Sequence, residues 1–138
     1  MPGFKFRYRL CGAPPTIEDL TFKDTETLSK GDLANLESGE IDLAATADTN
    51  LLGAILETQA GVDSTTKAKV ITDADAVYGV TDANARVKGA TLDLTGSTGA
   101  QGVTTSSNKE FVVVAASSAT EETLVRINVG KHHNNKAQ

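Results

Sequence analysis

The sequence predicts an all-β protein: a small compact β-barrel or sandwich with an extended N-terminal arm and one or two short helical turns. Short stretches rich in Val, Ile, Leu and Thr recur along the 138 residues. Gly, Asp, Asn and Ser separate them at intervals of about 8–12 residues, which is typical of barrels and sandwiches. No segment shows a sustained apolar period of 3.6 residues, so no long helix is expected.

The first predicted element is the extended arm, residues 1–16. Aromatic and cationic residues alternate near its start, so an extended chain is aromatic on one face and cationic on the other. The alternating residues are Phe4, Lys5, Phe6, Arg7, Tyr8 and Arg9. Pro14 and Pro15 stiffen the exit from the arm and bar a helix there.

The second element is a β-barrel domain over residues 17–130, in which seven stretches are predicted as strands. Three of them alternate apolar and polar residues, as half-buried strands do: 40–43, 91–95 and 124–129. Four are continuous apolar runs, which indicate more fully buried strands: 51–56, 68–72, 76–80 and 111–116. Turn-forming residues lie between them, for example in "SKGD" and "ESGE".

Short helical turns are expected at 81–86, capped by Thr81 or Asp82, and at 120–123, where acids favour a first turn. The Gly-, Ser- and Thr-rich stretch 95–108 is expected to form a long mobile loop or hairpin tip. Residues 131–138 are polar, and we expect a flexible C-terminal tail.

Composition excludes several classes of function. The chain has 13 basic and 18 acidic residues and a net charge of −5, which argues against bulk binding of nucleic acid. The longest apolar runs are far shorter than the about 20 residues that cross a bilayer. With six aromatic residues and no Trp, the core should be thin and aliphatic. The single Cys11 allows no internal disulfide, which is typical of a reducing cytoplasm, and we interpret it as a small buried or half-buried apolar residue.

A calcium loop is the first chemical site to consider. Four polar residues fall within twelve positions: Asp73, Asp75, Asp82 and Asn84. Counted from Asp73, an EF-hand loop needs an oxygen ligand, Gly and Glu at its fifth, sixth and twelfth positions. Val77, Tyr78 and Asn84 stand there instead. The motif fails, and we interpret the acids as solvated turn residues beside a buried strand.

No catalytic residue, cofactor or metal site is predicted. Gly96, Gly99 and Gly102 match neither a dinucleotide fingerprint nor a P-loop. His132 and His133 are adjacent on an extended tail, so their side chains point to opposite sides and make poor joint ligands. Cys11 lies at the other end of the chain from both histidines. Paired carboxylates of the kind glycosidases use stay open, because acids are plentiful, but no pair is marked.

The N-terminal arm has two interpretations. It is either the first strand of the barrel, with aromatic side chains in the core and cations in water, or a connector that reaches a partner. In the second case its backbone adds to a partner's sheet edge or groove, and its cations meet an acidic surface. We favour the second interpretation, because Pro-Pro follows the arm and the rest of the chain is acidic.

The middle of the chain resembles the capsid decoration, or head cement, proteins of tailed bacteriophages. The similar stretches are "LSKGDLANLESGEIDLAATADTNLLGAILET" (28–58), "DADAVYGVTDANARVKGATLDLTG" (73–96) and "ATEETLVRINVGKHH" (119–133). The resemblance covers residues 20–133 and rests on general pattern rather than a signature motif. It implies a compact β-barrel that carries no catalytic residue and binds the outside of the expanded capsid.

From the resemblance we expect a structural virion protein, made in the bacterial cytoplasm, that stabilises the mature shell by binding major capsid protein. The capsid-binding residues would be Phe4, Phe6 and Tyr8 as anchors and Lys5, Arg7 and Arg9 for charge complementarity. A homotrimer at a lattice three-fold axis is favoured, without nucleic acid or membrane partners. Two alternatives stay open: a tail-tube or head–tail connector subunit, and a carbohydrate-binding module displayed on the capsid.

Overall fold

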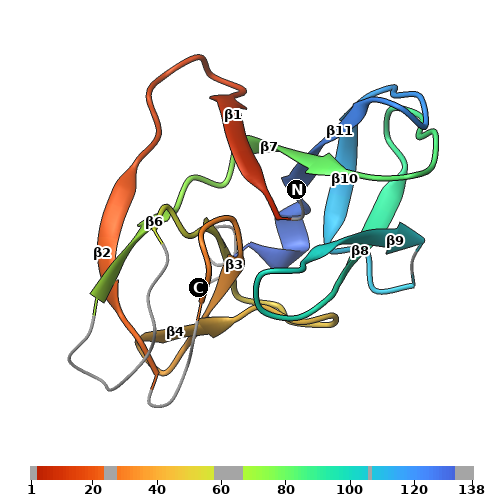
Figure 1. The fold of residues 1–138 in the computed structure, drawn as a ribbon. Coiled ribbons are helices and arrows are strands. Elements are labelled where there is room, and N and C mark those ends of the chain that lie inside the picture. Colours follow the sequence, from red (N-terminus) through yellow and green to blue (C-terminus); the bar gives the residue numbers. More distant parts are fainter. Residues whose placement is uncertain (1–2, 24–27, 58–66, 106, 133–138) are drawn as a thin grey trace.

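A computed structural model of the chain describes residues 3–23, 28–57, 67–105 and 107–132. The predicted all-β class is confirmed: strands carry the fold, and one 3-10 turn is its single helical element in the described part (Figure 1). The elements are β1 (Lys5–Arg9), β2 (Ile17–Thr21), β3 (Leu33–Glu37), β4 (Glu40–Leu43), β5 (Leu51–Ala54), β6 (Lys67–Ile71), β7 (Ala76–Thr81), β8 (Thr91–Thr95), β9 (Gly102–Thr105), β10 (Phe111–Ala115), β11 (Glu122–Ile127) and η1 (Val129–Lys131). Among these residues no helix is long and apolar enough to cross a membrane.

Three antiparallel sheets surround the core. The largest has the strand order β1-β7-β11-β10-β8-β9, and the smaller ones are β2-β6 and β4-β3-β5. The two ends of the large sheet approach each other where the Gly3 N–H donates to the Gln101 carbonyl over 2.9 Å. No strand ladder joins β1 to β9 in the described residues, so the barrel is not closed and the architecture is that of a sandwich.

All seven predicted strands are present: 40–43 and 91–95 have the predicted ends, and the other five have ends shifted by one or two residues. The sequence interpretation missed β2, β3 and β9. Of the two expectations for 95–108, the hairpin tip is confirmed for residues 96–101, which connect β8 to β9. The loop was wrong for residues 102–105, which form β9 and pair with β8 from Leu92↔Thr105 to Thr95↔Gly102. Val103 packs against the core at this place, and burial of its side chain favours the ordered strand.

The two predicted helical turns are also wrong. At 81–86 the Asp82 carboxylate accepts hydrogen bonds from the Asn84 N–H and from Arg86, whose backbone pairs with Ser117. At 120–123 the chain enters β11 directly, after a turn in which the side chain of Glu121 accepts from the Ser118 N–H. Side-chain acceptors hold both segments in non-helical turns. The helical turn lies at η1 instead.

The core consists of two clusters of buried, mostly aliphatic side chains. The larger lies under the six-stranded sheet and contains Phe4, Tyr78 and Phe111; the smaller is centred on Phe22, Ile41 and Val70. Five of the six aromatic residues are in or against these clusters. The buried side chains are mostly aliphatic, as the sequence indicated, and aromatic rings lie at the centre of the larger cluster.

Buried polar side chains connect the strands to the loops. Gln101 accepts from the Leu33 N–H over 2.6 Å and donates to the Ala44 carbonyl over 2.8 Å, and Glu110 accepts from the Leu94 N–H over 2.9 Å. His132 is fully buried, and its Nε2 lies 2.8 Å from the Leu52 carbonyl oxygen. The expected flexible tail therefore begins no earlier than residue 133, and residues 133–138 lie outside the described part.

The β3–β4 hairpin carries a pH-sensitive carboxyl group. Asp42 is half-buried opposite Asn35, and burial, together with the nearby carboxylates of Glu37 and Asp48, raises the pKa of Asp42 to about 6. The folded pKa exceeds the ordinary value of 3.8. Stability is therefore greatest while the proton is held, and it falls as the pH rises from about 4 to about 6.

We expect Asp42→Asn to raise the free energy of unfolding at about pH 7.5 by about 1 kcal/mol, a value discounted for partial exposure. The new amide can also donate to Asn35 Oδ1, a buried oxygen without a partner in the described structure. Urea unfolding at about pH 4 should show little gain. Glu18→Gln, a change at an exposed carboxyl, is the control; an equal gain at both pH values for Asp42→Asn would contradict the assignment.

Candidate docking surface

The structure places the predicted capsid-binding residues in an edge strand rather than in a detached arm. β1 pairs with β7 from Lys5↔Gly79 to Arg9↔Ala76 and forms one edge of the six-stranded sheet. Phe4 is 2% exposed and lies in the main core. Phe6 is half-buried against Tyr78, with ring centroids 6.4 Å apart, and Tyr8 is 41% exposed. Phe4 therefore anchors the protein's own fold.

Both guanidinium groups of β1 are paired with acids of the same chain. Arg7 Nε donates to Glu122 Oε1 over 2.6 Å, and Arg9 Nε donates to Asp75 Oδ1 over 2.8 Å. Arg9 also lies 3.4 Å from Asp73. The hydrogen bond from Arg7 lowers the pKa of Glu122 below its ordinary value. These pairs hold the edge strand on the body, so the two arginines have intramolecular partners.

Gly79 makes room for the Arg7–Glu122 pair. A Cβ at Gly79 would lie 1.5 Å from Glu122 Oε1, because the Glu122 side chain crosses directly over this glycine to reach β1. The register of β1 shifts between Phe6 and Tyr8, opposite Tyr78 and Val77, which makes Arg7 the extra residue of a β-bulge. The close approach and the bulge together bring Arg7 to Glu122.

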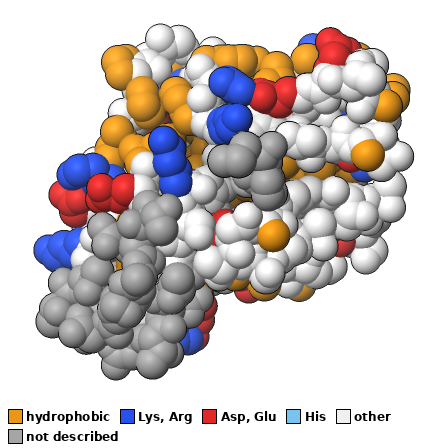
Figure 2. Space-filling model, viewed as in Figure 1, with side chains coloured by type: hydrophobic (Ala, Val, Ile, Leu, Met, Phe, Trp, Pro, Cys, Tyr) orange, Lys and Arg blue, Asp and Glu red, His pale blue; other side chains and the backbone are white. Residues whose placement is uncertain are grey.

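The connection from β1 to β2 exposes apolar side chains while its backbone is tied down. Leu10 and Ile17 are 52% and 46% exposed. With Tyr8 they are here called the apolar patch. In Figure 2, hydrophobic side chains gather at the upper left, where Figure 1 draws this connection. Cys11 is exposed as well, so the expectation that its side chain is at least half-buried was wrong.

Two of the turn acids hold the backbone of this connection. Asp75 accepts from the Cys11 N–H over 3.2 Å, and Asp73 accepts from the Thr16 N–H over 2.6 Å. The Thr72 N–H donates to the Thr16 carbonyl over 3.1 Å at the entry to β2. Asp73 is itself buried, so it is not the solvated acid expected from the sequence. The apolar patch is thereby presented on an ordered segment.

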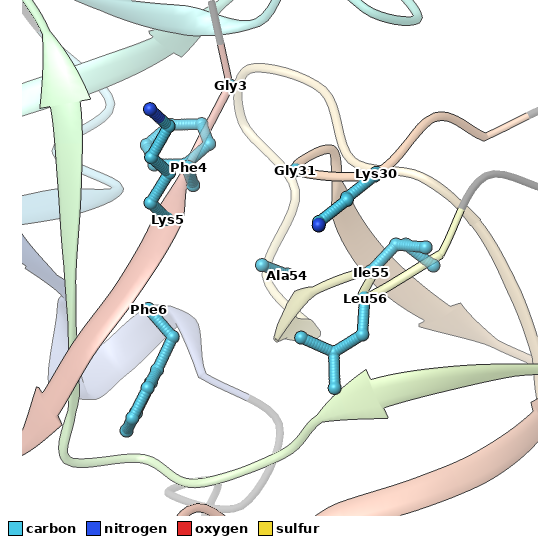
Figure 3. A pocket seen from close by; sticks show the side chains of 9 residues that line it. All are labelled: Gly3, Phe4, Lys5, Phe6, Lys30, Gly31, Ala54, Ile55 and Leu56. Atoms are coloured by element: carbon cyan, nitrogen blue, oxygen red, sulfur yellow. The ribbon is translucent and has the colours of Figure 1, made fainter.

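A pocket of about 400 Å³ lies beside β1, between this strand, the 30–31 turn and the chain that leaves β5 (Figure 3). Its apolar lining includes Phe4, Phe6, Ile55 and Leu56. Lys30 also lines it, and Figure 3 shows the Lys30 amine pointing into the space between β1 and residues 54–56. The sequence interpretation missed this pocket, because its walls come from three separate segments.

Other kinds of site find little support in the described residues. No group of three or more His, Cys, Asp or Glu side chains there could hold a metal ion. A carbohydrate-binding module needs exposed aromatic side chains that stack on sugar rings, and the aromatic residues outside the arm, Phe22, Tyr78 and Phe111, are all fully buried. Within the part of the chain that the structure describes, Tyr8 is therefore the one exposed aromatic side chain.

Comparison with models of known protein families found no match to this chain, and comparison with curated protein sequences also found none.

Proposed function

We propose that this chain is a non-enzymatic structural protein of a tailed-phage virion that binds the outer surface of the mature capsid and stabilises it. The observation that carries the proposal is the apolar patch, Tyr8, Leu10 and Ile17, displayed on a hydrogen-bonded segment beside an open sheet edge. Ordered, exposed apolar groups of this kind mark protein interaction sites, since they lose little entropy on binding. The resemblance of residues 20–133 to capsid decoration proteins supplies the partner class.

Binding of this kind stabilises the shell by mass action. A ligand that binds the mature lattice, and not the disassembled subunits, adds stability that grows with its concentration relative to the dissociation constant. The contact is proposed to come from the apolar patch and the main chain of β1. Arg7 and Arg9 act indirectly, because they position β1 through Glu122 and Asp75. We propose that the protein binds as a homotrimer at the three-fold axes of the capsid lattice.

The test is co-sedimentation with expanded, undecorated phage heads. We expect the full chain to pellet with heads, and Leu10→Asp and Ile17→Asp each to weaken binding about tenfold or more, since a buried unpaired carboxylate is costly. The matched control is Ala119→Asp, a change at an exposed position. Ala119 comes just before Glu122, which pairs with Thr81 at the end of β7, whereas Leu10 follows Arg9, which pairs with Ala76 at the start of β7. The two positions therefore lie at opposite ends of the strands. Deletion of the first residues is unsuitable, because it removes Phe4 from the core.

Three results would count against the proposal. A full chain that stays in the supernatant removes the capsid as partner. Equal loss of binding for Ala119→Asp shows that the apolar patch is not the contact. A ring of six or more copies in analytical ultracentrifugation favours the tail-tube or connector alternative over the trimer.

A further inference from the structure

We infer that the pocket beside β1 receives an extended segment of the partner protein, which adds as a strand to the free edge of β1 and carries acidic and apolar side chains. This inference deepens the proposed function and rests on it. It names the chemistry of the capsid segment that is recognised. Four features of the pocket lead to it.

The first feature is the direction of the β1 backbone. Among the residues that the structure describes, β1 pairs with a strand on one side only, and that strand is β7. On the other side of β1, the Phe4 N–H donates to the Gly31 carbonyl over 2.7 Å. Along a strand, the backbone N–H and C=O groups of alternate residues point to the same edge. The N–H and C=O of Phe6 therefore face the same side as the N–H of Phe4, away from β7. An incoming strand would therefore continue a hydrogen-bonding edge that Gly31 already begins.

The second feature is the opposite wall, which is also extended chain. Residues 55 and 56 continue from β5 and reach β6, through the Ile55↔Val70 bridge and a hydrogen bond of 3.0 Å from the Leu56 N–H to the Lys69 carbonyl. Figure 3 shows Leu56 pointing into the space that faces Phe6. The pocket is thus a slot between two extended segments, and its shape suits a third.

The third feature is the size and polarity of the slot. A volume of about 400 Å³ is at the small end of the range for ligand sites, which is about 300–1,000 Å³. It can hold one or two large apolar side chains. Phe6 and Leu56 are both only half-buried and pack against the main core from its rim. A side chain that entered here would complete their burial, which favours binding through the apolar area removed from water.

The fourth feature is charge. Lys5 and Lys30 are the titratable residues of the lining, which contains no acid. Lys5 also acts on the Glu122 carboxylate, whose pKa it helps to lower, so Lys30, whose amine points into the slot, is the main source of positive charge there. The two lysines favour a segment that carries carboxylates next to its apolar side chains. A basic segment would be repelled, and this includes a second copy of the cationic strand β1. Alternating acidic and apolar residues on an extended partner chain therefore match both the lining and the edge.

The experiment combines charge reversal with cross-linking, both in full-length protein bound to expanded heads. Lys5→Glu with Lys30→Glu should lower the affinity for heads at least tenfold. The control with Lys67→Glu and Lys109→Glu, two exposed lysines outside the pocket, should change it less than twofold. Binding of the parent chain should weaken as salt is raised, because the ion pairs are screened. Circular dichroism verifies that each variant folds.

The cross-linker p-benzoylphenylalanine at position 56, and separately at position 10 as a positive control, identifies what fills the pocket. We expect position 56 to cross-link to one capsid-protein peptide that contains Asp or Glu beside apolar residues. One combination of results overturns the inference but not the proposed function. In it, the parent chain binds heads and position 10 cross-links to capsid protein, but position 56 does not. The pocket variant with Lys5→Glu and Lys30→Glu also binds heads as tightly as the control variant with Lys67→Glu and Lys109→Glu. Cross-links from position 56 only to other copies of this chain also overturn the inference. Failure of the parent chain to bind heads overturns the proposed function itself.

Discussion

Phe4→Ala should lower the free energy of unfolding by about 3–5 kcal/mol, the usual cost of truncating a buried Phe. Phe4 is 2% exposed and stacks on Phe111 with ring centroids 5.1 Å apart, while the edge of Tyr78 meets it at 6.4 Å. Removing the ring leaves a cavity at the centre of the main core, and close-packed neighbours fill such cavities only in part. Urea unfolding followed by circular dichroism measures the change in midpoint.

Tyr8→Ala is the matched control for Phe4→Ala, since both change an aromatic residue at or next to β1. Tyr8 is 41% exposed, and we expect a loss within about 1 kcal/mol. The comparison decides between the two interpretations of the N-terminal segment. If Phe4→Ala unfolds at the same urea concentration as the parent chain, the segment is not part of the core, and the connector interpretation regains its place.

The local pattern of apolar and polar residues was enough to predict the strands whose apolar side chains face the core. The stretch 111–116 is uniformly apolar, and its strand β10 is covered by the core on one face. β2 was not predictable in this way. Its Ile17, Glu18 and Asp19 are all exposed, and β2 exists through pairing with β6, from Ile17↔Ile71 to Thr21↔Lys67. Propensity carries little information where pairing with a distant strand decides the structure.

The candidate docking surface was less predictable, because long-range pairs determine it. The alternation in residues 4–9 revealed a cationic face on an acidic protein, and this suggested an acidic partner. The acids that meet Arg7 and Arg9 are in the same chain, 115 and 66 residues away. No local pattern identifies which acid folds back onto which arginine. The sequence shows that Leu10 and Ile17 are apolar residues near Pro-Pro, but it does not show that their side chains are exposed.

Gly53→Ala should be as damaging as loss of the Phe4 ring, although it adds only one methyl group. A Cβ at Gly53 would lie 2.0 Å from the Ile71 carbonyl oxygen and 2.4 Å from the Tyr78 hydroxyl. The first contact is with backbone of β6, which cannot rotate away. The second displaces a buried hydroxyl that accepts a hydrogen bond from the Ala54 N–H over 3.3 Å. Overpacking with loss of a buried hydrogen bond should cost about 3 kcal/mol or more.

Gly102→Ala is the control for Gly53→Ala, because it makes the same chemical change in another strand. No atom lies within 4 Å of a Cβ at Gly102, and its backbone is outside the left-handed region. We expect a change within about 0.5 kcal/mol, with a small gain from the stiffer unfolded chain as the favoured sign. Thermal and urea unfolding of both variants measure the difference. Equal stability of the two would mean that β5 does not approach Ile71 and Tyr78 closely. The wall of the pocket at residues 54–56 would then be displaced as well, since it continues directly from Gly53.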